Sequence, residues 1–246
     1  MEGPPVSLLN DVTSFVASAL RYPRGFRAVV TRSERDGPTQ LLELYEFEAC
    51  PYCRKVREAL CELDLDYLSL PVAHGSPRRG ALKRRGSKVQ VPYLIDPNTE
   101  TEMYESDDIV SYLYRQYGLG RSDGSIVPLP RIVNDGLALA ASAARLTRGS
   151  RCRVPNSRRR LKPLELYNME ASPYCRKVRE ALSELDLQYV VRNVPKGSPQ
   201  REELAQRGGK VQVPFLVDPN TGTAMYESDE IAAYLEERYG VPAADN

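Results

Sequence analysis

Apolar residues near the start of the chain recur every three or four positions, which is the period of an amphipathic helix. This set comprises Leu8, Leu9, Val12, Phe15, Val16, Ala19 and Leu20. The same spacing returns 124 residues later at Ile132, Val133, Gly136, Leu139, Ala140, Ala143 and Ala144. The pattern predicts two related helices, over about 6–22 and about 131–147. Each contains an acidic residue, Asp11 or Asp135, and neither has a lysine-rich polar face, so both are expected to pack on the protein and not on a membrane.

Each predicted helix is followed by a polar connector and then by a stretch in which strand and helix patterns alternate. Turn signals such as Asp96-Pro97-Asn98 separate the last two strands. The first stretch predicts, in order, a strand over 41–47, a helix over 51–63, a strand over 67–72, a short basic helix over 77–85, two antiparallel strands within 91–106 and a helix after Ser106. This order describes a small mixed sheet with helices on both faces, an α/β fold.

The second half of the chain repeats the first without a gap. Residues 164–240 match residues 42–118 at an offset of 122, with 50 of 77 positions identical. A repeat of this length predicts two modules of ordinary domain size. We assign module 1 to 1–122, with its core at 41–118, and module 2 to 123–246, with its core at 163–240.

Composition argues against several classes of partner. The chain has 34 basic and 33 acidic residues, so its net charge of +1 creates no overall electrostatic field that would attract nucleic acid or anionic lipid. Its five cysteines do not form the paired spacing of a secreted disulfide framework. No apolar run approaches the ~18 residues of a membrane span. We therefore expect a cytoplasmic protein without nucleic-acid or membrane partners.

The Cys50-Pro-Tyr-Cys53 tetrapeptide is the candidate reactive site. Because proline is favoured at the first helical position, Pro51 predicts that Cys50 caps the following helix. Free backbone amides, the helix dipole and the nearby Arg54 and Lys55 are then expected to lower the pKa of the Cys50 thiol. Cys53 is placed to resolve a mixed disulfide on Cys50.

Zinc is the competing interpretation of a Cys-x-x-Cys pair. A structural zinc site needs four ligands, but the chain has no second cysteine pair and His74 is its only histidine. We therefore expect no metal site. In the second repeat, Ser172 stands where Cys50 would be, and Cys175 corresponds to Cys53. An oxygen atom cannot form a mixed disulfide, so dithiol exchange is excluded at Ser172.

Three motifs together resemble the thioredoxin-fold module shared by glutaredoxins and the N-terminal domain of glutathione transferases. They are "CPYC" at a helix start, "QVP" before a strand and "YESDDI" opening the last helix, and all recur in module 2 with the changes noted. The resemblance covers both cores but not the leading helices. It implies two tandem thioredoxin-like domains and glutathione as a cosubstrate.

The resemblance also implies a glutathione site in each module. A cis Val91-Pro92 peptide would present the valine backbone to the cysteinyl part, and Glu105 and Ser106 would bind the γ-glutamyl end. Serine is a good N-cap, so amides at that helix start could receive a carboxylate. The implied residues are Tyr52, Gln90, Val91, Pro92, Glu105 and Ser106 in module 1, and Tyr174, Gln212, Val213, Pro214, Glu227 and Ser228 in module 2.

Three functions remain open from the sequence. In the leading hypothesis Cys50 attacks a disulfide, and Cys53 or a second glutathione releases the product. In the second, the chain conjugates glutathione to electrophiles, with Ser172 donating to the glutathione thiolate or Cys175 reacting. In the third, the two modules pair as an intramolecular pseudo-dimer that only binds glutathione, a protein or an iron-sulfur cluster.

Overall fold

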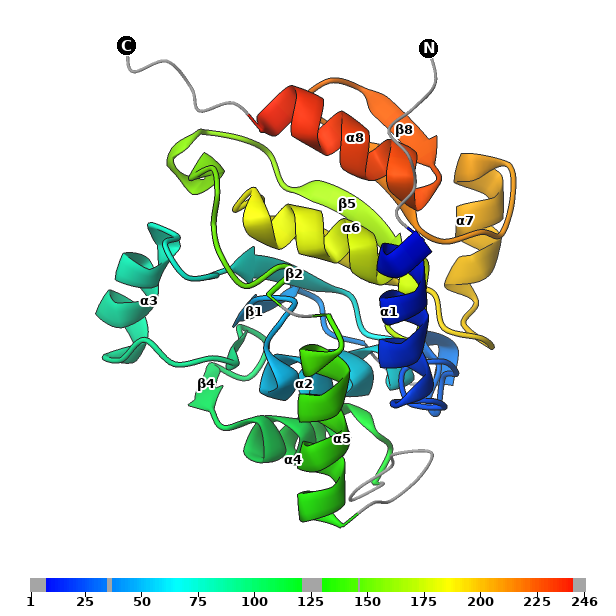
Figure 1. Ribbon diagram of the computed structural model, residues 1–246. Helices are drawn as coiled ribbons and strands as arrows, with labels where there is room; N and C mark the ends of the chain where they lie inside the picture. Colours follow the sequence, from blue (N-terminus) through cyan, green and yellow to red (C-terminus); the bar gives the residue numbers. More distant parts are fainter. Residues whose placement is uncertain (1–7, 35–36, 121–129, 146, 241–246) are drawn as a thin grey trace.

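The computed structural model describes residues 8–34, 37–120, 130–145 and 147–240 (Figure 1). Every element predicted for the first core is present there. The first leading helix ends at Ala19 and not near residue 22, and its predicted start at about residue 6 lies outside the described residues. These elements are α1 (Leu8–Ala19), β1 (Leu42–Glu46), α2 (Pro51–Glu62), β2 (Tyr67–Pro71), α3 (Arg78–Gly86), β3 (Tyr93–Asp96), β4 (Thr101–Tyr104) and α4 (Ser106–Tyr117).

The second half has the same order of elements. They are α5 (Arg131–Ala143), β5 (Leu164–Asn168), α6 (Pro173–Glu184), β6 (Tyr189–Asn193), α7 (Gln200–Gly208), β7 (Phe215–Asp218), β8 (Thr223–Tyr226) and α8 (Ser228–Tyr239). Two short 3₁₀ helices, Arg32–Glu34 and Asn156–Arg158, lie in the connectors. The mixed α/β fold predicted from the sequence is confirmed in both repeats.

The strands of both repeats form one continuous sheet. In the described part of the chain its order is β4-β3-β1-β2-β6-β5-β7-β8. Within each repeat the first two strands are parallel and the remaining pairings are antiparallel. The two halves join where β2 and β6 pair antiparallel, with Leu68 opposite Val190. The sequence predicted a small sheet in each module but not this junction.

One face of the sheet carries a core shared by both repeats. Apolar side chains of β1 and α2, such as Leu44 and Val56, belong to the same buried cluster as Leu166 and Val178 of the second repeat. The opposite face has two separate small clusters, one beneath α3 and one beneath α7. The α2 and α6 helices therefore both pack on this common core.

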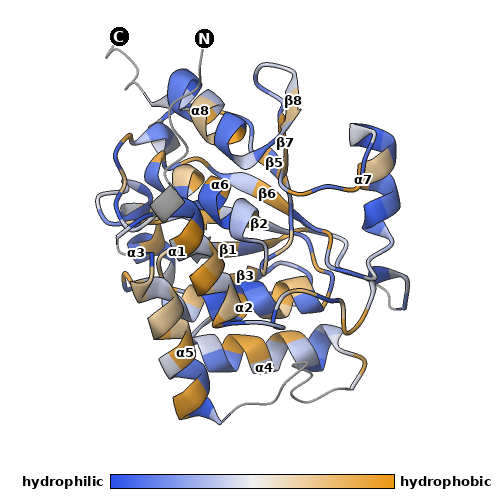
Figure 2. Ribbon diagram, turned by 45° about the vertical axis from the view of Figure 1, so that its right-hand side comes forward, coloured by the Kyte–Doolittle hydropathy of each residue, from blue (hydrophilic) through white to orange (hydrophobic). Residues whose placement is uncertain are grey.

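The leading helices are exchanged between the repeats. Helix α1 packs against α6 of the second repeat, and α5 packs against α2 of the first (Figure 1). Ion pairs accompany both contacts: Lys177 lies 2.8 Å from Asp11, and Lys55 lies 2.7 Å from Asp135. Figure 2 shows apolar residues along both exchanged helices. The expectation that these helices are packing elements is met, and the core that each one covers belongs to the other repeat.

A cluster of buried charges lies where the two repeats meet. Its members, each at most 2% exposed, are Glu46, Glu48, Arg54, Arg57, Glu170, Arg176 and Arg179. The Arg57 guanidinium lies 2.6 Å from Glu46, 2.9 Å from Glu48 and 3.2 Å from Glu170. Since Glu170 belongs to the other repeat, these ion pairs join the two halves. No helix in the described part of the chain is long and apolar enough to cross a membrane.

Candidate functional site

Cys50 lies at the N-terminal end of α2, as its sequence context predicts. The backbone amide of Cys53 donates to the Cys50 sulfur at 3.3 Å, and Pro51 occupies the first helical position. Cys50 is 5% exposed, and Cys53 is completely buried. Both are free thiols. The predicted helix cap is therefore confirmed, and it directs a backbone donor at the sulfur of Cys50, the less deeply buried residue of the pair.

The surroundings separate the acidities of the two thiols. A hydrogen bond from the Cys53 thiol lowers the pKa of Cys50, and this effect, with the amides of Cys53 and Tyr52 and the charge of Arg57, outweighs the opposing effect of burial. Burial raises the pKa of Cys53 well above its ordinary value, and its hydrogen bond to Cys50 raises it further. Cys50 is thus the thiol that ionises first.

The cations that we expected to activate Cys50 are engaged elsewhere. Lys55 pairs with Asp107 and Asp135, and Arg54 faces the buried charge cluster, 3.8 Å from Glu48. Neither cation is among the main causes of the lowered pKa of Cys50, and their expected contribution stays a prediction. Arg57, seven residues on and on the same face of α2 as Cys50, is the cation whose charge lowers the pKa of the thiol.

A pocket of about 420 Å³ opens beside Tyr52 of this tetrapeptide. It contains all six residues implied for glutathione in module 1, together with three that the sequence did not suggest. The lining residues are Tyr52, Gln90, Val91, Pro92, Glu105, Ser106, Asp107, Asp108 and Arg131. Segments separated by more than fifty residues in the sequence thus converge on one cavity of small-molecule size.

The backbone of this pocket has two special features. The Val91-Pro92 peptide is cis, as the resemblance implies. Glu105 has a φ of 66°, in the left-handed region that non-glycine residues rarely adopt. Its carboxylate accepts a hydrogen bond from the Gln90 amide at 2.7 Å. The second repeat reproduces both backbone features and the hydrogen bond, with a φ of 68° at Glu227. The left-handed conformation of Glu105 and Glu227 persists only where the surroundings enforce it, and such residues are commonly found at binding sites.

The start of α4 differs by one residue from the prediction. Ser106, expected to cap the helix, is its first residue, and Glu105 occupies the cap position without a side-chain capping bond. The expectation of a serine cap was therefore wrong. The left-handed conformation of Glu105 turns the chain into the helix one residue earlier. Ser106 is 7% exposed and remains part of the pocket wall.

In module 2, Ser172 reproduces the cap without the thiol. Its hydroxyl accepts from the Cys175 amide at 3.3 Å, and Pro173 starts α6. Cys175 is completely buried, and burial raises the pKa of its thiol. Reaction at Cys175, left open by the sequence, is disfavoured by both properties. The described residues contain no group of three or more side chains suited to hold a metal ion.

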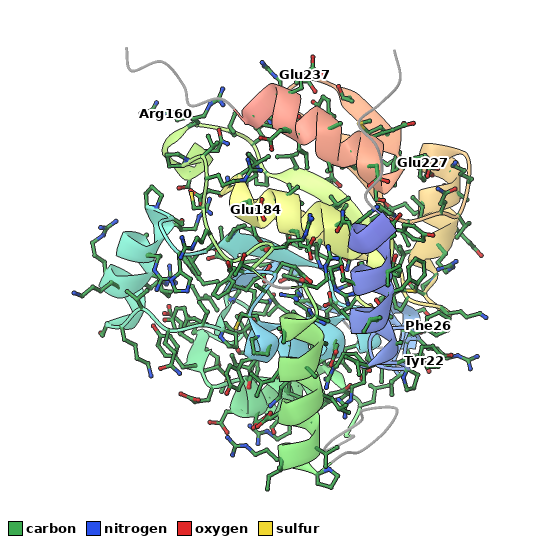
Figure 3. All side chains as sticks on the ribbon, viewed as in Figure 1. Tyr22, Phe26, Arg160, Glu184, Glu227 and Glu237 are labelled. Carbon is green, nitrogen blue, oxygen red and sulfur yellow. The ribbon has the colours of Figure 1, made fainter. Side chains whose placement is uncertain are left out.

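The cavity next to Ser172 is apolar, unlike the one in module 1. It has a volume of about 640 Å³ and is lined by Phe15, Ser18, Ala19, Tyr22, Phe26, Met169, Ala171, Ser172, Pro173, Tyr174 and Val213. We call it the Ser172 groove. Figure 3 shows Tyr22 and Phe26 together beyond the C-terminal end of α1, and their rings are 5.5 Å apart. Of the residues implied for glutathione in module 2, only Tyr174 and Val213 line this groove.

Helix exchange explains the site residues that sequence reasoning missed. Arg131 begins α5, the leading helix of the second repeat, yet it lines the pocket of the first and lies 2.8 Å from Asp107. Phe15 reaches the Ser172 groove from α1 in the same way. The only sequence signal of the helix exchange was an Asn-Asp dipeptide that occurs in both leading helices. Asp135, from the second of these dipeptides, contacts Lys55 near the first pocket.

The sequence matches a known domain family in both of its repeats. The model of the family "Glutathione S-transferase, N-terminal domain" matches the chain twice, at residues 44–122 and 166–243. Among curated proteins, no sequence is significantly similar to this chain. A solved structure from Leishmania, titled "TDR1 - a unique trimeric glutathione transferase", is 17% identical to this chain, with a TM-score of 0.29. The match covers 84% of this chain and 68% of the Leishmania chain. Since the two family matches span well over half of the residues, the chain belongs to the glutathione S-transferase N-terminal domain family and carries this domain twice.

Proposed function

We propose that the protein is a glutathione-linked thiol-disulfide oxidoreductase that reacts through Cys50. The observation that carries this proposal is the capped thiol of lowered pKa at Cys50, two residues before Tyr52, which lines a pocket containing the residues implied for glutathione. Glutathione would place its thiol toward Cys50, with its backbone along the Val91 edge. The Glu105 carboxylate and the start of α4 would hold its γ-glutamyl end.

The reaction begins with the Cys50 thiolate attacking the glutathione sulfur of a mixed disulfide. The bond between that sulfur and the substrate sulfur breaks, and the substrate leaves as a thiolate that takes a proton from solvent. Cys50 is then joined to glutathione. The thiolate of a second glutathione attacks the glutathione sulfur of this intermediate, so that glutathione disulfide forms and the Cys50 thiolate is restored.

Two properties of Cys53 support release by glutathione and not by Cys53 itself. Cys53 is completely buried, and its pKa is raised, so little of it is a thiolate near neutral pH. Its role in this scheme is to donate a hydrogen bond that stabilises the Cys50 thiolate. A dithiol route would instead require Cys53 to lose its proton within the core.

Reduction of a glutathionylated peptide by wild type and two variants tests this scheme. Cys50→Ser should lose at least ~100-fold in rate because oxygen cannot carry the mixed disulfide. This variant should fold, since module 2 has serine at the same helix cap. Cys53→Ser should keep at least about a tenth of the rate. Wild-type activity in Cys50→Ser would refute the proposal, and loss of activity in Cys53→Ser would refute release by glutathione.

A second function, glutathione conjugation to an electrophile, is favoured by the Ser172 groove. Its walls are mostly aromatic and aliphatic, and Ser172 is one of the residues that line it. A hydroxyl at a helix N-terminus can stabilise a thiolate by hydrogen bonding. Conjugation of glutathione to an aromatic electrophile should therefore survive Cys50→Ser and fall in Ser172→Ala. The reverse pattern would remove this candidate.

A further inference from the structure

The α3 helix differs in charge from its counterpart in the second repeat. It carries five basic residues and no acidic one, whereas α7 carries two of each. The two helices have the same length and corresponding places in their repeats, and each is followed by a residue in the left-handed conformation. Because α7 performs the same structural task without net charge, folding does not require the basic character of α3.

Three of the five basic side chains in α3 have structural partners. These are Arg78 with Asp186, Arg79 with the carbonyl of Val72, and Arg85 with Glu102. The remaining two, Lys83 and Arg84, are exposed and have no ion-pair partner among the described residues. Module 2 replaces them by Ala205 and Gln206. Two of the five charge differences between α3 and α7 therefore reside in exposed side chains that make no ion pair among the described residues.

The end of α3 is connected to the candidate glutathione pocket. Lys88, which is exposed, lies 4.3 Å above the centre of the Tyr104 ring. The Tyr104 hydroxyl donates to the carbonyls of Gly86 and Lys88 at 3.1 Å. Glu105, the next residue, contacts Gln90 inside the pocket. A ligand held at the pocket and extending toward α3 would meet Lys88 first and then the last turn of the helix.

We propose that Lys83, Arg84 and Lys88, which we call the α3 basic face, dock an acidic segment of the protein whose glutathionylated cysteine is reduced at Cys50. This inference rests on the function proposed above and adds the class of substrate. An acidic peptide fits better than nucleic acid, because the chain has a net charge of only +1 and the face spans a single short helix and the residue two beyond its end. Attraction of this kind raises the association rate and favours acidic partners.

The test compares two glutathionylated peptides of equal length, one with aspartate and glutamate around the cysteine and one with serine and asparagine. The variant Lys83→Ala/Arg84→Gln carries the residues that α7 has at these positions, so it should fold. The matched control Ala205→Lys/Gln206→Arg gives module 2 the charges of module 1. We would measure kcat/KM at low and high salt, and binding of both peptides by fluorescence anisotropy to proteins that also carry Cys50→Ser.

We expect the α3 variant to lose about threefold to tenfold in kcat/KM and in affinity for the acidic peptide at low salt, because it can no longer form two exposed ion pairs with that peptide. The neutral peptide, the module 2 control and high salt should show little change. Equal effects on both peptides would overturn the docking inference, as would tighter binding of an oligonucleotide than of the acidic peptide. If neither peptide is reduced but the affinity difference persists, docking stands and the oxidoreductase function falls.

Discussion

Glu48 joins the two repeats through buried ion pairs. Its carboxylate is 2% exposed and lies 2.9 Å from Arg57 and 2.9 Å from Arg179, with Arg176 at 3.5 Å. Burial alone would raise its pKa, but the charges of Arg179 and Arg57 lower the pKa well below its usual range. The group is therefore ionised in the folded protein, and Glu48→Gln removes one of three carboxylates facing four buried arginines.

The expected cost of Glu48→Gln is about 3–5 kcal/mol, the range for breaking a buried ion pair by removing one partner. This is a large share of the ~5–15 kcal/mol by which domains are stable. Glutamine keeps the shape of glutamate, so the loss reports charge and not packing. Since the folded pKa is depressed, the contribution is present above the unfolded value of ~4.3 and is lost as pH falls from there toward the folded value.

Urea unfolding followed by circular dichroism at pH 7 and at pH 3.5 measures this effect. Glu236→Gln is the matched control, because Glu236 also accepts two hydrogen bonds from an arginine, Arg153, but both side chains are nearly half exposed. The control should cost at most ~1 kcal/mol. If Glu48→Gln costs no more than Glu236→Gln at pH 7, or if its cost does not shrink in acid, the buried charges do not stabilise the junction as reasoned.

Three further predictions concern the thiol site, a buried acid and the exchanged helices. Cys53→Ala should raise the pKa of Cys50 by removing its hydrogen-bond donor, which pH-dependent alkylation would show as a shifted midpoint; an unchanged midpoint would contradict the assignment. Burial raises the pKa of Glu62 to about 7, so stability should fall by about 3 kcal/mol as pH rises from ~4.5 to ~7, and Glu62→Gln should flatten that slope in thermal unfolding. Arg145→Leu, which leaves buried Glu180 without its cation, should cost about 3 kcal/mol and expose α1 to proteolysis, whereas unaltered protection would argue against the exchange.

Local features of the site could be predicted because a few neighbouring residues encode them. Pro51 fixes the start of α2 and therefore the cap position of Cys50, and the same holds for Ser172. Hydrophobic periodicity gave the helices and strands of both cores, since its period follows from backbone geometry. The boundary at Ser106 was missed because the left-handed conformation of Glu105 is enforced by its surroundings and not by its residue type.

The sequence alone could not predict which of these elements pack together, and the reason is physical. The first ten residues of α2 and α6, 51–60 and 173–182, are identical, so an apolar leading helix meets the same surface on either one. Only the tertiary structure decides that α1 lies on α6 and α5 on α2, because chain reach and the β2–β6 junction fix which surface is near. The repeat, the capped thiol and the family motifs were determined by the sequence itself. The positions of Arg131 in the first pocket and of Phe15 in the Ser172 groove were decided by contacts between residues far apart in the chain.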